Sequence, residues 1–543
     1  MPPHVRRPGR RAPQGPHRHL DGQNDPRPRR AASAVAALCL ALVVTGCAGA
    51  GTNSTSSRSD RLVMGTGALP QTLDPVLASD VQTDLTSTPV YDTLVGYDAQ
   101  GVLTPAVATA WTVAPDAASL ELTLRSDIRF HDGTVLTARD VVYTLDRVHR
   151  LGIGIASVIA DYQSARALDD THVSITLSKP NSAFLGALSR VYLLNSALVQ
   201  ANAGGDDAQR WLATHEAGSG PFALDSYRAG QQIVFSAVSQ TWRPLPGRPK
   251  TLVYRYIVEA AARREELKAG TIDIAQGLTP ADLTALDGVA GIETSEVPSP
   301  MQLYVFFDTA NGPTADPRVR EAIQLAYDYQ GHVDTILAGR GQIAAGPLPS
   351  LMACRANLPT SRQDIARAKE LLAQAGAAGL NLTMYYQSTI PEHAKAATLL
   401  QSNLRDIGVT LTLKSVTYPE FVKALSSKGT APDLGMLWDF PLYPDAAAML
   451  DRVYDSKFAG TGSNYGMYAN PRADELLARA LAQPSPTASC DLAKQAEEAI
   501  DADHVSMNIA SSRTVYAHRA GIAGFTASPT HILLDTAALT RTN

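Results

Sequence analysis

From residue 61 onward the chain shows two hydrophobic periods. Every second residue is apolar at residues 120–124 (LELTL), and residues 171–177 and 232–238 repeat this alternation. A period of two is typical of β-strands that bury one face. We therefore expect strands at these three places in the first half of the chain.

The stretch after the first of these strands carries a turn and a helix start. Residues 128–131 (IRFH) are expected to form a further strand, which ends in the turn Asp132–Gly133. Thr137 and Asp140 then have the spacing of a capping box, in which the two side chains satisfy free N–H groups at a helix start. A helix is expected to follow and to continue into Arg147.

Around residue 300 the period changes to that of a helix. Asp316 is a suitable N-cap, and Pro317 is favoured at the first helical position. One apolar face then follows, formed by Val319, Ala322, Ile323, Ala326 and Tyr327. This spacing predicts an amphipathic helix.

Helices and strands continue to alternate further along the chain. A second capping box, Ser361 and Asp364, is expected to open a helix. Strands are expected at residues 380–384 and 409–413, and a helix at 397–407 lies between them. Strands separated by helices favour parallel pairing, so the sequence predicts an α/β fold.

The first 46 residues follow none of these patterns. Residues 1–30 contain eight arginines and seven prolines, and residues 31–44 are almost entirely apolar. A basic stretch, a short apolar run and small residues are typical of a secretory signal peptide. Because a membrane-spanning helix needs about 20 apolar residues, this run is too short to serve as one. We expect residues 1–46 to be a signal peptide.

A cysteine follows the apolar run directly. Residues 44–47 (VTGC) resemble the lipobox of bacterial lipoproteins, in which the cysteine is lipidated and becomes the first residue of the mature chain. The resemblance implies lipidation of Cys47 and a flexible tether at residues 47–60, which are rich in Gly, Ser and Thr. The alternative is a plain signal peptide with an incidental cysteine.

Removal of the signal peptide changes the charge of the protein. The whole chain has a formal net charge of -5, but residues 1–46 hold eight arginines and two aspartates. The remaining body therefore carries a net charge of about -11. An acidic body disfavours nucleic acid as a partner, because nucleic-acid binding depends on Lys and Arg at the phosphates.

Two cysteines, Cys354 and Cys490, remain in the body. Export would place them in a compartment where disulfides form. The sequence leaves two states open, a Cys354–Cys490 disulfide and two buried free thiols.

The usual spacings of catalytic and metal sites are absent from the sequence. The chain has no Cys-x-x-Cys, no Gly-x-Ser-x-Gly and no Gly-Lys dipeptide of a phosphate-binding loop. We therefore expect neither an enzyme nor a metal or cofactor site, although a dispersed catalytic triad is not excluded by motifs alone.

A set of motifs in a fixed order resembles the family 5 extracellular solute-binding proteins, the peptide, dipeptide and nickel receptors of ABC importers. They occupy residues 73–75 (LDP), 91–94 (YDTL), 103–108 (LTPAVA), 130–133 (FHDG), 136–141 (LTARDV), 218–222 (GSGPF), 270–273 (GTID), 316–323 (DPRVREAI), 468–470 (YAN) and 524–525 (GF). The resemblance covers residues 61–543.

The resemblance implies a two-lobed fold of the periplasmic-binding-protein type II kind, with an extra domain inserted in the first lobe. On this chain, the first lobe maps to residues 61–90, 216–299 and 505–543. The inserted domain maps to residues 91–215, and the second lobe maps to residues 300–504.

Two segments are implied as ligand contacts. The first is Ser79, Asp80 and Val81, whose backbone would pair with an extended peptide as an added strand. The second is residues 435–445 (GMLWDFPLYPD), in which Trp438, Asp439, Tyr443 and Asp445 are the candidates.

The second segment departs from the family pattern. Peptide-binding members carry an aspartate here that pairs with the α-ammonium group of the ligand. When the chain is aligned on Tyr443 and Asp445, Leu442 occupies that position, and Asp439 takes the role only if the alignment is shifted. A surface or capping role for Asp439 and a core position for Trp438 are the alternatives, and a ligand without an amine fits the departure equally well.

These observations predict a monomeric, lipid-anchored receptor outside the cytoplasm that captures short peptides and delivers them to an ABC permease and its ATPase subunits. Other solutes of the same class are nickel complexes, oligosaccharides and small cationic metabolites. An exported peptide hydrolase is the alternative from another class. A sensor lipoprotein that presents peptide without transport has the same sequence features.

Overall fold

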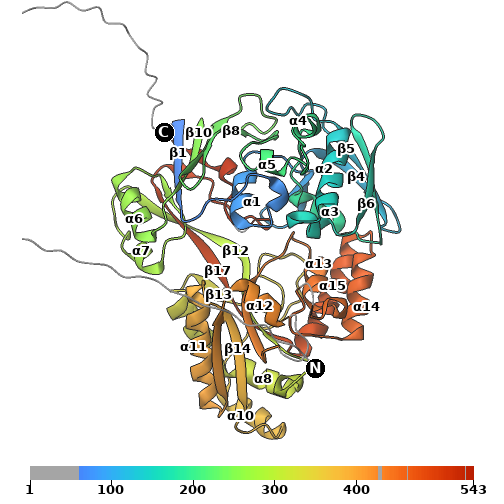
Figure 1. Ribbon diagram of the computed structural model, residues 1–543. Coiled ribbons are helices and arrows are strands. Elements are labelled where there is room, and N and C mark those ends of the chain that lie inside the picture. Colours follow the sequence, from blue (N-terminus) through green and yellow to red (C-terminus); the bar gives the residue numbers. More distant parts are fainter. Residues whose placement is uncertain (1–59, 426–430, 461–462, 532, 543) are drawn as a thin grey trace, which may run out of the picture. The chain divides into compact units, whose positions relative to one another are not determined.

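The computed structural model describes residues 60–425, 431–460, 463–531 and 533–542, which form a mixed α/β fold (Figure 1). The predicted signal peptide, Cys47 and all of the predicted tether except Asp60 lie outside the described residues. No helix of the described part is both long and apolar enough to cross a membrane.

One large sheet extends through the described chain. Its strand order is β15-β14-β16-β12-β17-β11-β1-β10-β9-β8, and β13 pairs with β17 at the side. The strands are β1 (Arg61–Thr66), β8 (Phe222–Arg228), β9 (Gln232–Ala237), β10 (Thr251–Tyr256), β11 (Ile274–Ala275), β12 (Ile292–Phe307), β13 (Gly341–Ile343), β14 (Asn381–Gln387), β15 (Thr410–Val416), β16 (Leu434–Asp439) and β17 (Ser506–Arg519).

Two long antiparallel strands, β12 and β17, divide this sheet into two halves (Figure 1). On one side, β17 pairs with β11 of the first lobe, which contains β1 and β8 to β11. On the other side, β12 pairs with β16 of the second lobe, which contains β14 to β16. The β12–β17 register shifts between Pro298 and Gln302 and again after Leu303. The two lobes are thus joined through a bulged strand pair.

Parallel pairing occurs in both lobes. In the second lobe β14 pairs in parallel with β15 and with β16, and in the first lobe β1 pairs in parallel with β10 and β11. The expectation from the strand–helix alternation at residues 380–413 is therefore confirmed. The sheet as a whole is mixed, because β12, β17 and the β8–β9–β10 meander are antiparallel.

The longer helices pack against strands or against one another. They are α1 (Val81–Ser87), α2 (Ala138–Leu151), α4 (Ser196–Ala201), α6 (Ala260–Ala269), α8 (Pro317–Ala326), α10 (Ile365–Gln374), α11 (Pro391–Asp406), α12 (Tyr418–Leu425), α13 (Ala446–Tyr454), α14 (Pro471–Leu481) and α15 (Pro486–Ala502). The apolar face predicted for α8 packs with α10 and α11 over β12 and β14 in one continuous core.

A second sheet lies within residues 91–215, the range expected to be an inserted domain. Its order is β4-β5-β7-β6, with β4 at Ala108–Val113, β5 at Ser119–Leu124, β6 at Tyr162–Ala167 and β7 at His172–Leu177. Helix α2 packs against β6 and β7, and Thr137 and Asp140 form the expected capping box at its start. The lobe and insert boundaries given above stay a prediction.

Two local expectations are wrong. Residues 128–131 form no strand but only a single bridge, Arg129 with Val135, because the chain turns back at once. Helix α10 begins at Ile365 rather than after Ser361, since the carboxylate of Asp364 caps it by accepting the N–H of Arg367 at 3.0 Å. The hydroxyl of Ser361 instead donates to the carbonyl of Asn508.

Candidate functional site

A cavity of about 490 Å³ opens between the second-sheet region and the second lobe. Three tyrosines line it: Tyr418 at the start of α12, Tyr443 before α13, and Tyr465. We call it the tyrosine cavity. Its charged lining residues are Asp161 and Lys179 on one side and Asp451 and Arg452 of α13 on the other. An aromatic lining with a few polar groups is typical of small-molecule sites.

Strand β16 determines which residues of the predicted ligand segment face this region. Successive side chains of a strand point to opposite faces. Leu434, Met436 and Trp438 therefore share a face and belong to, or pack against, the core of the second lobe. Asp439 lies on the opposite face and is only 7% exposed. Trp438 is half-buried against this core, and neither Trp438 nor Asp439 is among the residues that line the tyrosine cavity, so their role as ligand contacts stays a prediction.

Asp439 is held by a cation of this chain. Nη2 of Arg452 contacts Oδ1 of Asp439 at 2.9 Å and Oδ2 at 3.1 Å, and it also donates to the carbonyl of Phe440. Nη1 of Arg452 donates to the hydroxyl of Ser463 at 2.7 Å. Burial lowers the pKa of Arg452, but the Asp439 carboxylate outweighs burial and raises it. The carboxylate predicted to bind a ligand amine is therefore already in an ion pair.

The other carboxylates at the cavity are paired as well. Nζ of Lys457 contacts Asp451, and it lies 2.8 Å from Oδ2 of Asp455. Burial nevertheless raises the pKa of Asp451 to about 6. Across the cavity, Asp161 contacts Nζ of Lys179 at 3.2 Å and accepts a hydrogen bond from Asn181 at 2.8 Å.

Tyr443 and Asp445 both lie directly before the start of α13. Tyr443 is 8% exposed and contributes to the tyrosine cavity. Asp445 is the N-cap of α13 and accepts the N–H of Ala448 at 2.9 Å. Its side chain lines a second cavity of about 600 Å³, together with Val102, Trp111 and the Cys354–Cys490 disulfide. Burial raises the pKa of Asp445.

The first predicted ligand segment forms a helix start. Oδ1 of Asp80 accepts the N–H groups of Gln82 at 3.1 Å and Thr83 at 3.0 Å, and Val81 is the first residue of α1. The N–H of Asp80 donates to Leu77. The expected added-strand pairing is therefore not supported by the backbone of this segment, because capping turns it into a helix. Ser79 and Asp80 are exposed, and their role as ligand contacts stays a prediction.

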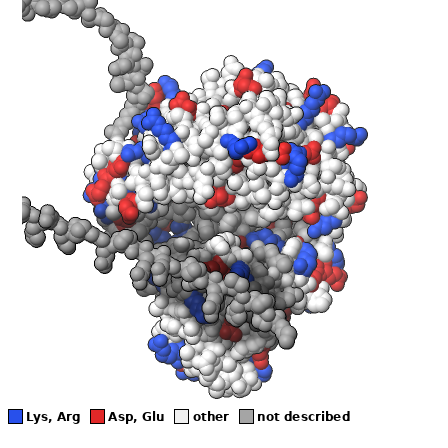
Figure 2. Space-filling model, viewed as in Figure 1, with Lys and Arg blue, Asp and Glu red and all other residues white. Residues whose placement is uncertain are grey.

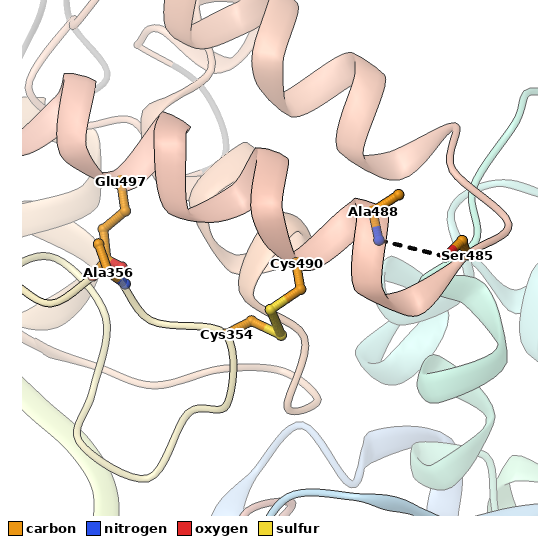
Figure 3. The surroundings of a disulfide bond; sticks show 6 residues. All are labelled: Cys354, Ala356, Ser485, Ala488, Cys490 and Glu497. Atoms are coloured by element: carbon orange, nitrogen blue, oxygen red, sulfur yellow. Dashed lines mark hydrogen bonds between the residues drawn. A yellow bond between two sulfur atoms is a disulfide. The ribbon is translucent and has the colours of Figure 1, made fainter.

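Of the two cysteine states that the sequence left open, the structure has the disulfide. Cys354 lies on a loop and Cys490 on α15, with their Cα atoms 5.1 Å apart (Figure 3). Two turns further along α15, the buried carboxylate of Glu497 accepts the N–H of Ala356 at 2.6 Å and that of Leu348 at 3.2 Å. The same loop is thus bound to α15 at two points.

Sequence reasoning missed Arg452, Asp161 and Lys179. Arg452 follows Asp439 by thirteen residues, and Lys179 lies more than 250 residues before both. No local spacing connects these residues, because their proximity arises only when the chain folds.

Charged side chains of both signs are mixed on the face shown in Figure 2, where Lys and Arg are scattered among Asp and Glu. In the described ranges, no group of three or more His, Cys, Asp or Glu side chains is placed to hold a metal ion.

Comparison with known proteins identifies a family and a fold. The family model described as "Bacterial extracellular solute-binding proteins, family 5 Middle" matches residues 102–461. The probable D,D-dipeptide-binding periplasmic protein DdpA of Escherichia coli is 29% identical over 484 residues, which cover 87% of this chain and 92% of DdpA. The glutathione-binding protein GsiB of Shigella flexneri is 26% identical, covering 90% of this chain and 96% of GsiB.

Solved structures share the fold. The periplasmic binding protein DppA of Helicobacter pylori, in complex with the peptide STSA, has a TM-score of 0.73 at 22% identity and covers 89% of this chain and 98% of its own. HbpA2 of Haemophilus parasuis has a TM-score of 0.79 at 22% identity, covering 89% of this chain and all of HbpA2. NikZ of Campylobacter jejuni, in complex with Ni(L-His), has a TM-score of 0.73 at 21% identity, covering 89% of this chain and all of NikZ.

Proposed function

Because the chain belongs to the bacterial extracellular solute-binding proteins of family 5, we propose that it is the lipid-anchored receptor of an ABC importer and that it captures short peptides. The names of its relatives support a peptide: DdpA is a probable dipeptide-binding protein, and GsiB binds glutathione. The solved H. pylori relative holds the peptide STSA.

The tyrosine cavity is the observation that carries this proposal. It lies between the region of the β4–β7 sheet and helices α12 and α13 of the second-lobe region, two parts that share one hydrophobic core. A ligand that contacts both parts favours the arrangement in which they enclose it. Tyr418 is 52% exposed, so part of its side chain lies open to a ligand that enters.

Capture needs no covalent step in this mechanism. The ligand binds between the two parts, the bulged β12–β17 pair takes up the change in angle, and the enclosed form is the one presented to the permease. Lipid at Cys47 would hold the receptor at the outer face of the cell membrane, and the permease with its ATPase subunits would complete the importer.

A screen of ligand classes tests the solute. Thermal unfolding of the wild-type protein is followed with peptide pools, oligosaccharides, Ni²⁺ with histidine, and small cations. A ligand at one hundred times its dissociation constant adds about 2.7 kcal/mol to stability. We expect this stabilisation with peptides; stabilisation by another class alone would replace the peptide assignment, and conversion of the peptides to products would indicate a hydrolase.

Filling the cavity tests the site. Ala448 lies on α13 in the lining of the tyrosine cavity, so Ala448→Trp is expected to weaken peptide binding at least about tenfold, which is 1.4 kcal/mol. The matched control is Val102→Trp, which fills the second cavity from an exposed position and should bind normally. Equal losses in both variants, or none in Ala448→Trp, would place the site elsewhere.

A further inference from the structure

All four charged side chains that line the tyrosine cavity in the described part of the chain have partners. Asp161 contacts Lys179, Asp451 contacts Lys457, and Arg452 contacts Asp439. Each charged lining residue is therefore already in contact with a side chain of opposite charge. A charged ligand group would find no unpaired opposite charge among these residues.

In the pair of Asp439 and Arg452 the carboxylate is held through both of its oxygens. Both carboxylate oxygens of Asp439 contact Arg452, and Oδ1 also accepts the N–H of Phe440 at 2.8 Å. The side chain of Asp439 is 10% exposed and that of Arg452 is 21% exposed. To bind Asp439, a ligand ammonium would have to compete with a guanidinium nitrogen that contacts both carboxylate oxygens, and charge-assisted hydrogen bonds of this kind are strong.

Displacement would also leave Arg452 unpaired. A buried charge that loses its partner is strongly unfavourable, because protein replaces water around it without compensation. The remaining polar groups of the cavity are uncharged: the hydroxyls of Tyr418, Tyr443, Tyr465, Ser157 and Ser463, and the amide of Asn181. Oδ1 of Asn181 is buried and accepts no hydrogen bond from the described residues. Such groups match amide N–H and C=O groups rather than an ammonium.

We infer that the tyrosine cavity selects ligands whose enclosed end is uncharged, such as peptides with an acylated or cyclised amino terminus, and that Arg452 sets this selectivity by holding Asp439. The inference rests on the proposed peptide-binding function. Arg452 acts here as a specificity-determining residue through its effect on Asp439.

Competition between two matched pools tests the selectivity. Synthetic peptides of two to five residues are prepared with identical sequences, one pool with free amino termini and one N-acetylated. The protein is incubated with an equimolar mixture, unbound peptide is removed by gel filtration, and bound peptide is quantified by mass spectrometry. We expect the acetylated form to be retained at least tenfold over the free form.

Equal retention, or an excess of the free form, overturns the inference and leaves peptide binding intact. If neither pool is retained, the proposed function fails and this inference fails with it. The two failures are therefore distinguishable in one experiment.

Two substitutions test the role of Arg452. Arg452→Met leaves Asp439 unpaired, so the ratio of free to acetylated peptide should rise at least tenfold. Asp439→Asn leaves Arg452 unpaired and should shift the ratio further toward the acetylated pool. The control is Arg479→Met, an exposed arginine of α14 whose loss should leave the wild-type ratio.

The second substitution keeps the test decisive if the first variant does not fold. A ratio that stays at the wild-type value in every folded variant overturns the assignment to Arg452.

Discussion

At the scale of single residues, the structure gives the Leu73-Asp74-Pro75 motif a structural role. Both oxygens of Asp74 contact Arg147 of α2, at 3.0 and 2.6 Å, and Nε of Arg147 donates to the carbonyl of Asp207. Arg147 is fully buried and Asp74 is 2% exposed. This ion pair connects the first lobe to the β4–β7 sheet region.

Loss of this pair should therefore be costly. Arg147→Met would leave the buried Asp74 carboxylate without its cation, and we expect a loss of about 3–5 kcal/mol in the free energy of unfolding. Urea denaturation measures it. Arg150→Met on the same helix is the control, since Arg150 is half exposed and its contact with Asp207 should contribute about 0–1 kcal/mol. Equal effects in the two variants would contradict this account.

At the scale of elements, α15 is bound to the loop containing Cys354 by the disulfide and by Glu497 (Figure 3). Glu497 is fully buried, and burial raises its pKa to about 7 although two backbone N–H groups favour the charged form. The contact is thus pH-dependent, whereas the disulfide is not.

The sign of that dependence follows from the shift. The pKa of Glu497 is raised on folding, so between about pH 4.3, the value for an unperturbed Glu, and pH 7 the folded chain holds a proton that the unfolded chain has lost. Stability is then greatest below this range and falls as pH rises through it, by on the order of 3 kcal/mol for this group.

Glu497→Gln should remove this part of the pH dependence. The free energies of unfolding of wild type and variant are measured in urea at pH 5 and pH 7 without reductant. Glu498→Gln provides the control, because Glu498 is the exposed neighbour on the same helix. Asp451, with its pKa raised to about 6, adds the same pH dependence to the free energy of unfolding of all three proteins, so its contribution cancels in the comparison. A pH dependence in Glu497→Gln as steep as in wild type would refute this explanation.

At the scale of the whole molecule, the path between the two lobes of the large sheet runs through β12 and β17. A ligand enclosed at the tyrosine cavity should shift the described body toward a more compact state. We expect the radius of gyration from small-angle X-ray scattering to fall on addition of a stabilising peptide. In Ala448→Trp the same peptide concentration should leave the radius of gyration unchanged. If the radius of gyration of that variant fell as much as that of the wild type, closure would not depend on this cavity.

Much of the fold was predictable because it depends on near neighbours in the sequence. The strand period at residues 120–124, the capping box of Thr137 and Asp140, and the Pro317 helix start are set by residues two to four apart, and the structure has all three. The expected strand that does not form at residues 128–131 and the misplaced start of α10 also depend on local competition, as when Asp364 rather than Ser361 supplies the cap of α10.

The sequence by itself determined the order of helices and strands, the acidic character of the body and membership of a family, because these depend on composition, on short spacings and on ordered motifs. Tertiary structure alone decided that Trp438 packs against a core, that Cys354 forms a disulfide with Cys490, and that Arg452 forms an ion pair with Asp439. The physical reason is that such partners come into contact only after the chain has folded. The free energy of burying a charge depends on which side chain of opposite charge then lies beside it.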